Sequence, residues 1–251
     1  MNYDFSKITD LHELLHYSAF FSNAEYNSVP ELFHYTDNEA KSKIVCDSDI
    51  SLKLTKVKNF QDKNEGRHIL NVYDRVCRDF LKQYTDRKFE EIMRSVKNDF
   101  LPFLNRNENK YVFCFSKSGN NKYLIDKYAH KNSETGCCIG LQAFAIEEFA
   151  DNDWVNLLDV LYDSVRLAQS IRNVIIKAYQ LKDQDFDDLK IIHKILLNQL
   201  LIYSLCYKSS EFEREEETRL VVSLPERPGL IFEGDVYLKM KKSALYCVLD
   251  V

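Results

Sequence analysis

Short apolar runs alternate along the chain with longer stretches in which apolar residues recur at helical spacing. Several runs are rich in β-branched and aromatic residues and are bounded by polar or turn-forming residues, which predicts strands. These strands are expected near Leu32, Ile50, Tyr111, Cys137 and Leu220, with further strands at residues 154–162, 236–241 and 244–251. No internal repeat or low-complexity linker interrupts them, so the pattern favours one α+β domain over residues 1–251.

Apolar residues three and four positions apart predict helices laid on this sheet. The first predicted helix, residues 10–21, belongs to an N-terminal helical extension of residues 1–30. The last predicted helical segment, residues 163–207, is an insertion with an acidic joint at residues 183–188. A break in the pattern is expected at Thr85 and Asp86, between two of the helices. The predicted helical segments are residues 10–21, 69–80, 89–100 and 163–207.

The composition is that of a folded protein, with 45% hydrophobic and 29% charged residues among 251. The net charge of −5 lacks the global basic field that non-specific nucleic-acid binding needs, so nucleic acid is not indicated as a partner. No apolar run approaches the roughly 18 residues of a membrane span, and no membrane partner is expected. Seven scattered cysteines, without a C-x-x-C pair or a signal peptide, predict reduced thiols in the cytoplasm.

One motif near the start of the chain fits a metal site. His12, Glu13 and His16 match the H-E-x-x-H pattern, in which two histidines on one helical face bind zinc and the glutamate acts as general base. Almost no chain precedes this helix to form the substrate-binding sheet that such peptidases generally place upstream. A surface helix without bound zinc is therefore the favoured interpretation, and a zinc hydrolase is kept as an alternative.

Polar residues follow directly on the first predicted strand. The run at residues 31–36 passes through His34, Tyr35 and Thr36 into a helix that Asp37 or Asn38 can cap. His34 is expected at the end of this strand, where a polar side chain can reach a cleft. The alternative interpretation is that His34 only completes the strand end.

Two later segments also place polar groups beside strands. Ser116 ends the strand that begins at Tyr111, and a short helix over residues 122–131 carries Tyr123 and Tyr128. This makes the end of that strand a second candidate for a binding site.

An acidic segment, residues 211–219, leads straight into the strand at Leu220. By composition alone it is a solvated acidic turn. Alternation along a strand that enters at Glu215 would place Glu215, Glu217 and Arg219 on one face, where Arg219 can pair with one of the acids.

Four stretches, taken in order, resemble an uncharacterised bacterial family, the domain of unknown function 2971. The chain departs from the family pattern at Gln61 and Lys63, which replace Asn and Pro of a Phe-Asn-Asp-Pro loop, and at Ile125, where Trp is usual. The family's bacterial setting associates the chain with toxins or phage-defence effectors. The stretches are Leu32–Thr36; Phe60–Glu65; Phe115 and Ser116 with Tyr128, Ala129 and Gly136–Gly140; and Phe212 with Glu215, Glu217 and Arg219.

The arrangement of these stretches is in turn similar to that of the ADP-ribosyltransferase superfamily. This resemblance implies an α+β fold with an ADP-ribosyltransferase-like mixed or split β-sheet and helical insertions. It also implies NAD, or a related nucleotide, as the substrate, with no metal. The catalytic residues implied are Glu217, His34 and Tyr128, and the residues implied to bind the nucleotide are His34, Tyr35, Thr36, Ser116, Tyr123, Tyr128, Glu215 and Arg219.

The chemistry suits these residue types. Cleavage of the nicotinamide–ribose bond builds positive charge on the ribose, which a fixed carboxylate such as Glu217 can stabilise, while Tyr123 or Tyr128 can face the cationic ring. Substitution of Glu217 by Gln is then expected to abolish turnover and to leave binding and stability nearly unchanged. The acceptor stays open: a protein side chain, a nucleic-acid base, a small molecule, or water in an NAD glycohydrolase. A non-catalytic nucleotide-binding or interaction module on the same fold is the alternative.

Overall fold

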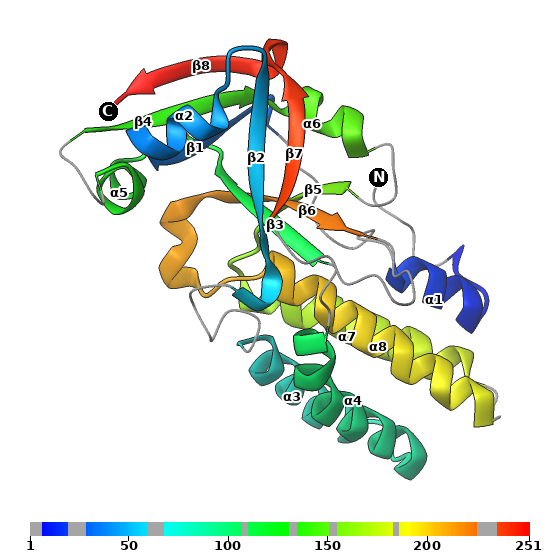
Figure 1. Ribbon diagram of the computed structural model, residues 1–251. Helices are drawn as coiled ribbons and strands as arrows, with labels where there is room; N and C mark the ends of the chain where they lie inside the picture. The colour runs from blue at the N-terminus through cyan, green and yellow to red at the C-terminus, as the bar shows by residue number, and fades with distance from the viewer. Residues whose placement is uncertain are drawn as a thin grey trace. The chain divides into compact units, whose positions relative to one another are not determined.

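The computed structural model describes residues 7–19, 29–59, 68–106, 110–130, 135–150, 155–182, 186–224 and 235–251. The chain forms two compact units, and each is assembled from three separate segments of sequence. One unit comprises Met1–Ala24, Gln61–Asn107 and Leu161–Ser210. The other comprises Glu25–Phe60, Glu108–Val160 and Glu211–Val251. The first is helical, and the second contains the β-sheet (Figure 1).

The helical unit is held together by one apolar core. Its helices each bury an apolar stripe, as their periodicity predicts, and Phe80, Phe89 and Tyr179 pack their rings within about 5.5 Å of one another at its centre. The predicted break at Thr85 and Asp86 is confirmed, because Asp86 caps a new helix by accepting a hydrogen bond from the Phe89 amide. The helices are α1 (Leu11–Ala19), α3 (His68–Leu81), α4 (Arg87–Arg106), α7 (Ser164–Leu181) and α8 (Phe186–Cys206).

Helix α8 is a long apolar helix of the helical unit. By length and composition Asp187–Cys206 is long and apolar enough to cross a membrane, although the sequence runs had suggested that no segment reaches that length. About two-thirds of the segment is buried inside the protein, which is what a core helix requires.

The second unit is an antiparallel sheet of eight strands. The order of the main sheet is β5-β6-β3-β1-β4-β8. Figure 1 shows β1, β4 and β8 side by side although they come from the first, middle and last parts of the chain. The strands are β1 (Glu31–Asp37), β2 (Asp49–Lys56), β3 (Lys110–Ser116), β4 (Gly136–Gln142), β5 (Val155–Asp159), β6 (Glu217–Ser223), β7 (Val236–Lys241) and β8 (Leu245–Asp250).

The prediction of five strands in one sheet is confirmed, with a correction to their direction. Each described strand pair is antiparallel, so the sheet is open and antiparallel where a mixed or split sheet was expected. Strand β2 touches β3 only through two residue pairs, Thr55 with Val112 and Lys56 with Tyr111. It then leaves the main sheet and pairs with β7 along six residues. The fold is thus α+β.

Short helices connect the strands. As predicted, Asp37 caps α2 by accepting a hydrogen bond of 2.7 Å from the Ala40 amide. The segment that contains Gln61 and Lys63, where the chain departs from the family pattern, lies outside the described residues. The connecting elements are α2 (Asn38–Ile44), η2 (Val57–Asn59), α5 (Lys122–Leu124), η3 (Ile125–Ala129), α6 (Ala143–Ala150), η4 (Ser210–Glu215) and η5 (Lys242–Ala244).

Side-chain alternation divides the sheet into two chemically different faces. Tyr111, Phe113 and Phe115 of β3 point into the main apolar core of this unit. The opposite face carries Phe33 and Tyr35 of β1, which pack against Leu124 and Cys138 in a smaller cluster. Because this second face has less apolar cover, it is where polar side chains and a groove lie.

Candidate functional site

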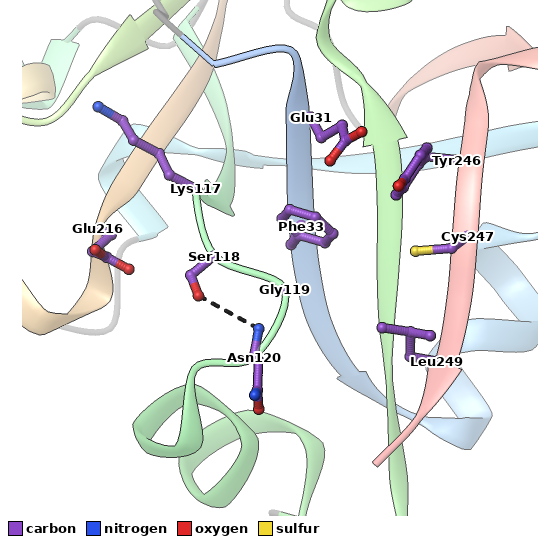
Figure 2. A pocket seen from close by; sticks show the side chains of 10 residues that line it. All are labelled: Glu31, Phe33, Lys117, Ser118, Gly119, Asn120, Glu216, Tyr246, Cys247 and Leu249. Carbon is purple, nitrogen blue, oxygen red and sulfur yellow. Dashed lines mark hydrogen bonds between the residues drawn. The ribbon is translucent and has the colours of Figure 1, made fainter.

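A groove of about 880 Å³ lies on this second face of the sheet (Figure 2). Strand β1 provides the ring at its centre, and β8 provides one wall. The loop that follows β3 provides the other wall, together with the turn that precedes β6. The residues that line it are Glu31, Phe33, Lys117, Ser118, Gly119, Asn120, Glu216, Tyr246, Cys247 and Leu249.

Two glycines allow the walls to close on Phe33. A Cβ atom on Gly119 would lie 2.7 Å from the Cε1 ring carbon of Phe33. A Cβ atom on Gly140 would lie 3.1 Å from the same carbon and 2.7 Å from Cys247 Sγ. The loop after β3 and the floor strand β4 therefore reach the ring only because these two positions lack a side chain.

The loop after β3 is fixed by Tyr35. The Tyr35 hydroxyl donates a hydrogen bond of 2.7 Å to the Ser118 carbonyl and accepts one of 2.9 Å from the Asn121 amide. Burial raises the pKa of Tyr35 well above its ordinary value of 10, so the hydroxyl keeps its proton. The Asn121 side chain caps α5 and donates to the Arg214 carbonyl at 2.7 Å. One tyrosine thus connects β1 to the groove wall.

Three consecutive acids at the start of β6 have three different environments. Glu215 and Glu217 are buried, and Glu216 between them is exposed and lines the groove. Glu216 has a φ of 46°, a left-handed backbone conformation that costs a non-glycine residue of the order of 1 kcal/mol or more. Its carbonyl accepts a hydrogen bond of 2.9 Å from the Lys117 amide, which fastens this turn to the loop after β3.

Glu215 is bound by a lysine that lies among aromatic rings. Lys127 Nζ is 2.7 Å from Glu215 Oε1 and within 6 Å of the ring centres of Tyr123, Tyr128 and Phe212. Burial alone would lower the pKa of Lys127, but the hydrogen bonds to Glu215, Tyr128 and Tyr123 together outweigh it and raise the pKa. Lys127 belongs to η3, a single π-helical turn, a feature that is rare and frequently found at functional sites.

Glu217 is paired with a buried arginine. Arg219 Nε donates to Glu217 Oε1 at 2.9 Å and Arg219 Nη2 donates to Glu217 Oε2 at 3.3 Å. Only 4% of Glu217 and 1% of Arg219 is exposed. The predicted pairing of Arg219 with one of the acids is therefore found. The strand itself begins at Glu217, so Glu215 lies before β6 and the expected alternation does not extend to it.

A third buried carboxylate, that of Asp159, forms an ion pair with the lysine of the groove. Asp159 Oδ2 lies 2.6 Å from Lys117 Nζ, and Asp159 Oδ1 accepts a hydrogen bond of 2.7 Å from Thr218. Asp159 is only 6% exposed. Lys117 therefore lies at the groove with its charge already matched.

Comparison with protein-family models finds a match over part of this chain. A family model matches residues 126–220. Its description is protein of unknown function, DUF2971. The searches of curated proteins and of solved structures found no match. The DUF2971 match supports the resemblance seen in the sequence over this part of the chain.

The segment matched by the DUF2971 model contains some of the residues described above and leaves out others. It includes Lys127 and Tyr128 together with the whole acidic turn at Glu215, Glu216 and Glu217. Strand β1, the loop after β3 and strand β8 lie outside the matched residues. The acidic turn is thus the part of the site that belongs to the matched segment.

His34 and Thr36 lie away from the groove. His34 is in the middle of β1 and not at its end, and its ring stacks 4.4 Å from that of Phe113 on the main core face. Its Nδ1 lies 3.0 Å from the Cys114 carbonyl, and burial lowers the pKa of His34 to about 4. Side chains alternate along a strand, so His34 and Thr36 share the face opposite Tyr35. The expected meeting of His34 with Glu217 in one cleft is not found.

The other residues implied by the resemblance are likewise absent from the residues that line the groove. Ser116 is buried, and its hydroxyl accepts a hydrogen bond of 3.2 Å from the Ser118 amide, so it shapes the loop. Tyr123 and Tyr128 surround Lys127. Tyr123 is also stacked by Arg214, whose guanidinium carbon is 4.6 Å from the ring centre.

Sequence reasoning did not select the residues that line the groove. Among them Phe33 and Tyr246 supply its rings, and Glu31, Lys117 and Glu216 supply charge. Phe33 and Lys117 could have been found from the sequence, because Phe33 precedes His34 and Lys117 follows Ser116. Nothing in the sequence marks Glu216, because glutamate rarely adopts a positive φ.

The zinc motif lies on α1 and serves the helix start. Glu13 Oε2 accepts hydrogen bonds from the Thr9 amide and hydroxyl at 2.7 and 3.1 Å, and the Glu13 amide donates to Asp10 Oδ1 at 2.8 Å. Glu13 is therefore engaged in a capping arrangement. His12 and His16 are exposed, and the described part of the chain contains no group of three or more His, Cys, Asp or Glu side chains that could hold a metal ion.

Proposed function

We propose that the protein binds NAD, or a closely related nucleotide, in the groove and cleaves its nicotinamide–ribose bond. In this reaction the bond between ribose C1′ and the pyridinium nitrogen breaks and its electron pair stays on nicotinamide. An acceptor oxygen or nitrogen then bonds to C1′ and loses its proton. The acceptor is a macromolecule in an ADP-ribosyltransferase or water in an NAD glycohydrolase.

The observation that carries the proposal is Glu216. Its left-handed backbone places an exposed carboxylate at the groove, while the acids on either side of it are buried. Strained non-glycine residues are found at functional sites more often than elsewhere, because the surrounding structure must hold them in place. A carboxylate held in this way is suited to stabilise the positive charge that develops on the ribose in the transition state.

Aromatic surface completes the requirements of this chemistry. Phe33 lies at the centre of the groove and Tyr246 is 51% exposed at its wall. A cationic pyridinium ring gains attraction from such faces. In this proposal Glu216 takes the role that the sequence had suggested for Glu217. Glu217 is then the positioning residue below the turn, through its pair with Arg219.

A non-catalytic binding module is the second candidate, and one observation favours it. Glu215 and Glu217, the two acids singled out by the family resemblance, are both buried and ion-paired with Lys127 and Arg219. Buried pairs of this kind fix the turn whether or not a reaction occurs. Such a module would bind the nucleotide in the same groove without consuming it.

The test compares Glu216→Gln with wild type, and uses Glu211→Gln as a matched control. Glu211 is an exposed acid of η4 that does not line the groove. NAD consumption and NAD binding are both measured, with cell extract as the source of acceptors. The enzyme proposal predicts that Glu216→Gln lowers turnover about a hundredfold or more, with binding nearly unchanged and Glu211→Gln like wild type.

Two results would redirect the proposal. Tight binding of NAD without consumption by any of the proteins supports the module. Turnover that survives Glu216→Gln but is lost in a folded Glu217→Gln protein returns the catalytic role to Glu217. Absence of both binding and turnover in wild type contradicts both candidates.

A further inference from the structure

The groove carries two carboxylates whose charge the described residues do not match. Three charged side chains line it: Glu31, Glu216 and Lys117. Lys117 is paired with the buried Asp159 at 2.6 Å, and Figure 2 shows its side chain directed away from Phe33. The residues that the structure describes form no salt bridge with Glu31 or Glu216. The groove is therefore electronegative.

The loop that walls the groove offers little to an anion. Phosphate sites in loops depend on backbone N–H groups that converge on the ligand. Here four of the five backbone amides from Lys117 to Asn121 donate hydrogen bonds inside the protein. The Lys117, Ser118, Asn120 and Asn121 amides donate to the Glu216 carbonyl, the Ser116 hydroxyl, the Ser118 hydroxyl and the Tyr35 hydroxyl, respectively.

Aromatic rings and carboxylates together form the environment that flat organic cations prefer. Tyr246 is half exposed at one wall, and Phe33, which is 9% exposed, lies at the centre between Gly119 and Gly140. Cation–π attraction acts at such rings, and the two acids add Coulomb attraction. We propose that the groove is a binding site for a flat organic cation, which Glu31 and Glu216 select against neutral and anionic groups.

Two sources could supply this chemistry. One is the pyridinium ring of NAD, and for that source alone the inference rests on the proposed function. The other is the guanidinium group of an arginine side chain on a partner protein. In either case a pyrophosphate does not share the groove, because it would lie beside two carboxylates without a free lysine. A dinucleotide would therefore place only its nicotinamide end here.

Nicotinamide and 1-methylnicotinamide provide a matched pair of probes, because they have the same ring and differ in charge. Methylguanidine represents the arginine source, and ADP represents the anionic part of a nucleotide. Binding to the ¹⁵N-labelled full chain is followed by the shifts of the Gly119 and Asn120 amides, which lie in the groove wall. The test variant carries Glu31→Gln and Glu216→Gln together, and the control variant carries Glu211→Gln.

The inference predicts that 1-methylnicotinamide binds at least about threefold more tightly than nicotinamide. Added salt should reduce this ratio of affinities. ADP should leave the Gly119 and Asn120 amide signals unshifted. The double variant should lose the ratio, and Glu211→Gln should keep it. A stronger response to methylguanidine than to 1-methylnicotinamide assigns the groove to an arginine partner. Equal binding of the neutral and charged rings, or tighter binding of ADP, overturns the inference.

The outcome is separable from that of the NAD assay. Selective cation binding without NAD turnover leaves the cation site in place and contradicts the proposed reaction. Turnover of NAD without any preference for the charged ring contradicts the cation site and leaves the proposed reaction standing.

Discussion

Removal of the Glu217 charge should destabilise the fold strongly. Glu217→Gln preserves the size of the side chain and one hydrogen-bond acceptor, but it removes the carboxylate charge to which the Arg219 guanidinium donates two hydrogen bonds. Arg219 is 1% exposed, so water cannot take the place of that carboxylate. This differs from the expectation drawn from the sequence, in which the same substitution leaves stability nearly unchanged.

The magnitude follows from the geometry of the pair. Two N–H groups of Arg219 bind the two carboxylate oxygens at 2.9 and 3.3 Å. A buried charge that loses its partner typically costs about 3–5 kcal/mol. Because Gln keeps one acceptor, we expect about 3 kcal/mol, a large part of the roughly 5–15 kcal/mol that ordinary domains possess. For a chain of this size that corresponds to a melting temperature lower by about 6–12 °C.

Urea denaturation of the full chain measures this loss, with Glu211→Gln as the control. A double variant, Glu217→Met with Arg219→Met, separates the two parts of the explanation. If the cost comes from breaking the buried ion pair, the double variant should recover most of the stability, because apolar replacement of a whole buried pair is often nearly neutral. A loss below about 1 kcal/mol in Glu217→Gln would refute the reasoning, since it would mean that the guanidinium is already solvated or paired elsewhere.

Two further predictions concern the sheet. Gly119→Ala would place a Cβ atom 2.7 Å from the Phe33 ring, so we expect a loss of about 1–3 kcal/mol by urea denaturation; unchanged stability would show that the loop can move away. His34 has a pKa lowered from 6.5 to about 4, so the unfolded chain binds a proton at His34 before the folded chain does as the pH falls from 6.5 to 4. As the pH falls through this window, the free energy of unfolding should therefore fall by up to about 3 kcal/mol. His34→Gln should remove this part of the pH dependence. The same pH dependence in both proteins would contradict a lowered pKa of His34 in the folded chain.

Much of the secondary structure could be predicted because its determinants are local. The strand at Leu32, the cap at Asp37 and the break at Asp86 depend on residue types within a few positions of one another. The direction of strand pairing depends on which distant segments meet. Strand β3 pairs with β6 along its length and with β2 at one end. Nothing within the sequence of β3 encodes that choice of partners.

The site was less predictable for two physical reasons. A shift of one position along a strand moves a side chain to the opposite face, so His34 and Tyr35 separate although they are neighbours in sequence. The environment of an acid depends on partners far along the chain, as Glu215 with Lys127 and Asp159 with Lys117 show. Composition suggested a solvated turn at residues 211–219, yet two of its acids are among the most buried charges described here.

The strand order of the sheet has a consequence for how the chain folds. Strand β1 pairs with β4, β4 with β8, and β3 with β6, so each of these neighbours is separated by roughly a hundred residues of sequence. Contacts of such long range make folding slow, because a large loop must close before each pair is formed. During synthesis β4 must wait with one edge uncovered until residues 245–250 leave the ribosome. Its apolar segment, from Cys137 to Leu141, is then the part of the sheet most open to pairing with another nascent chain.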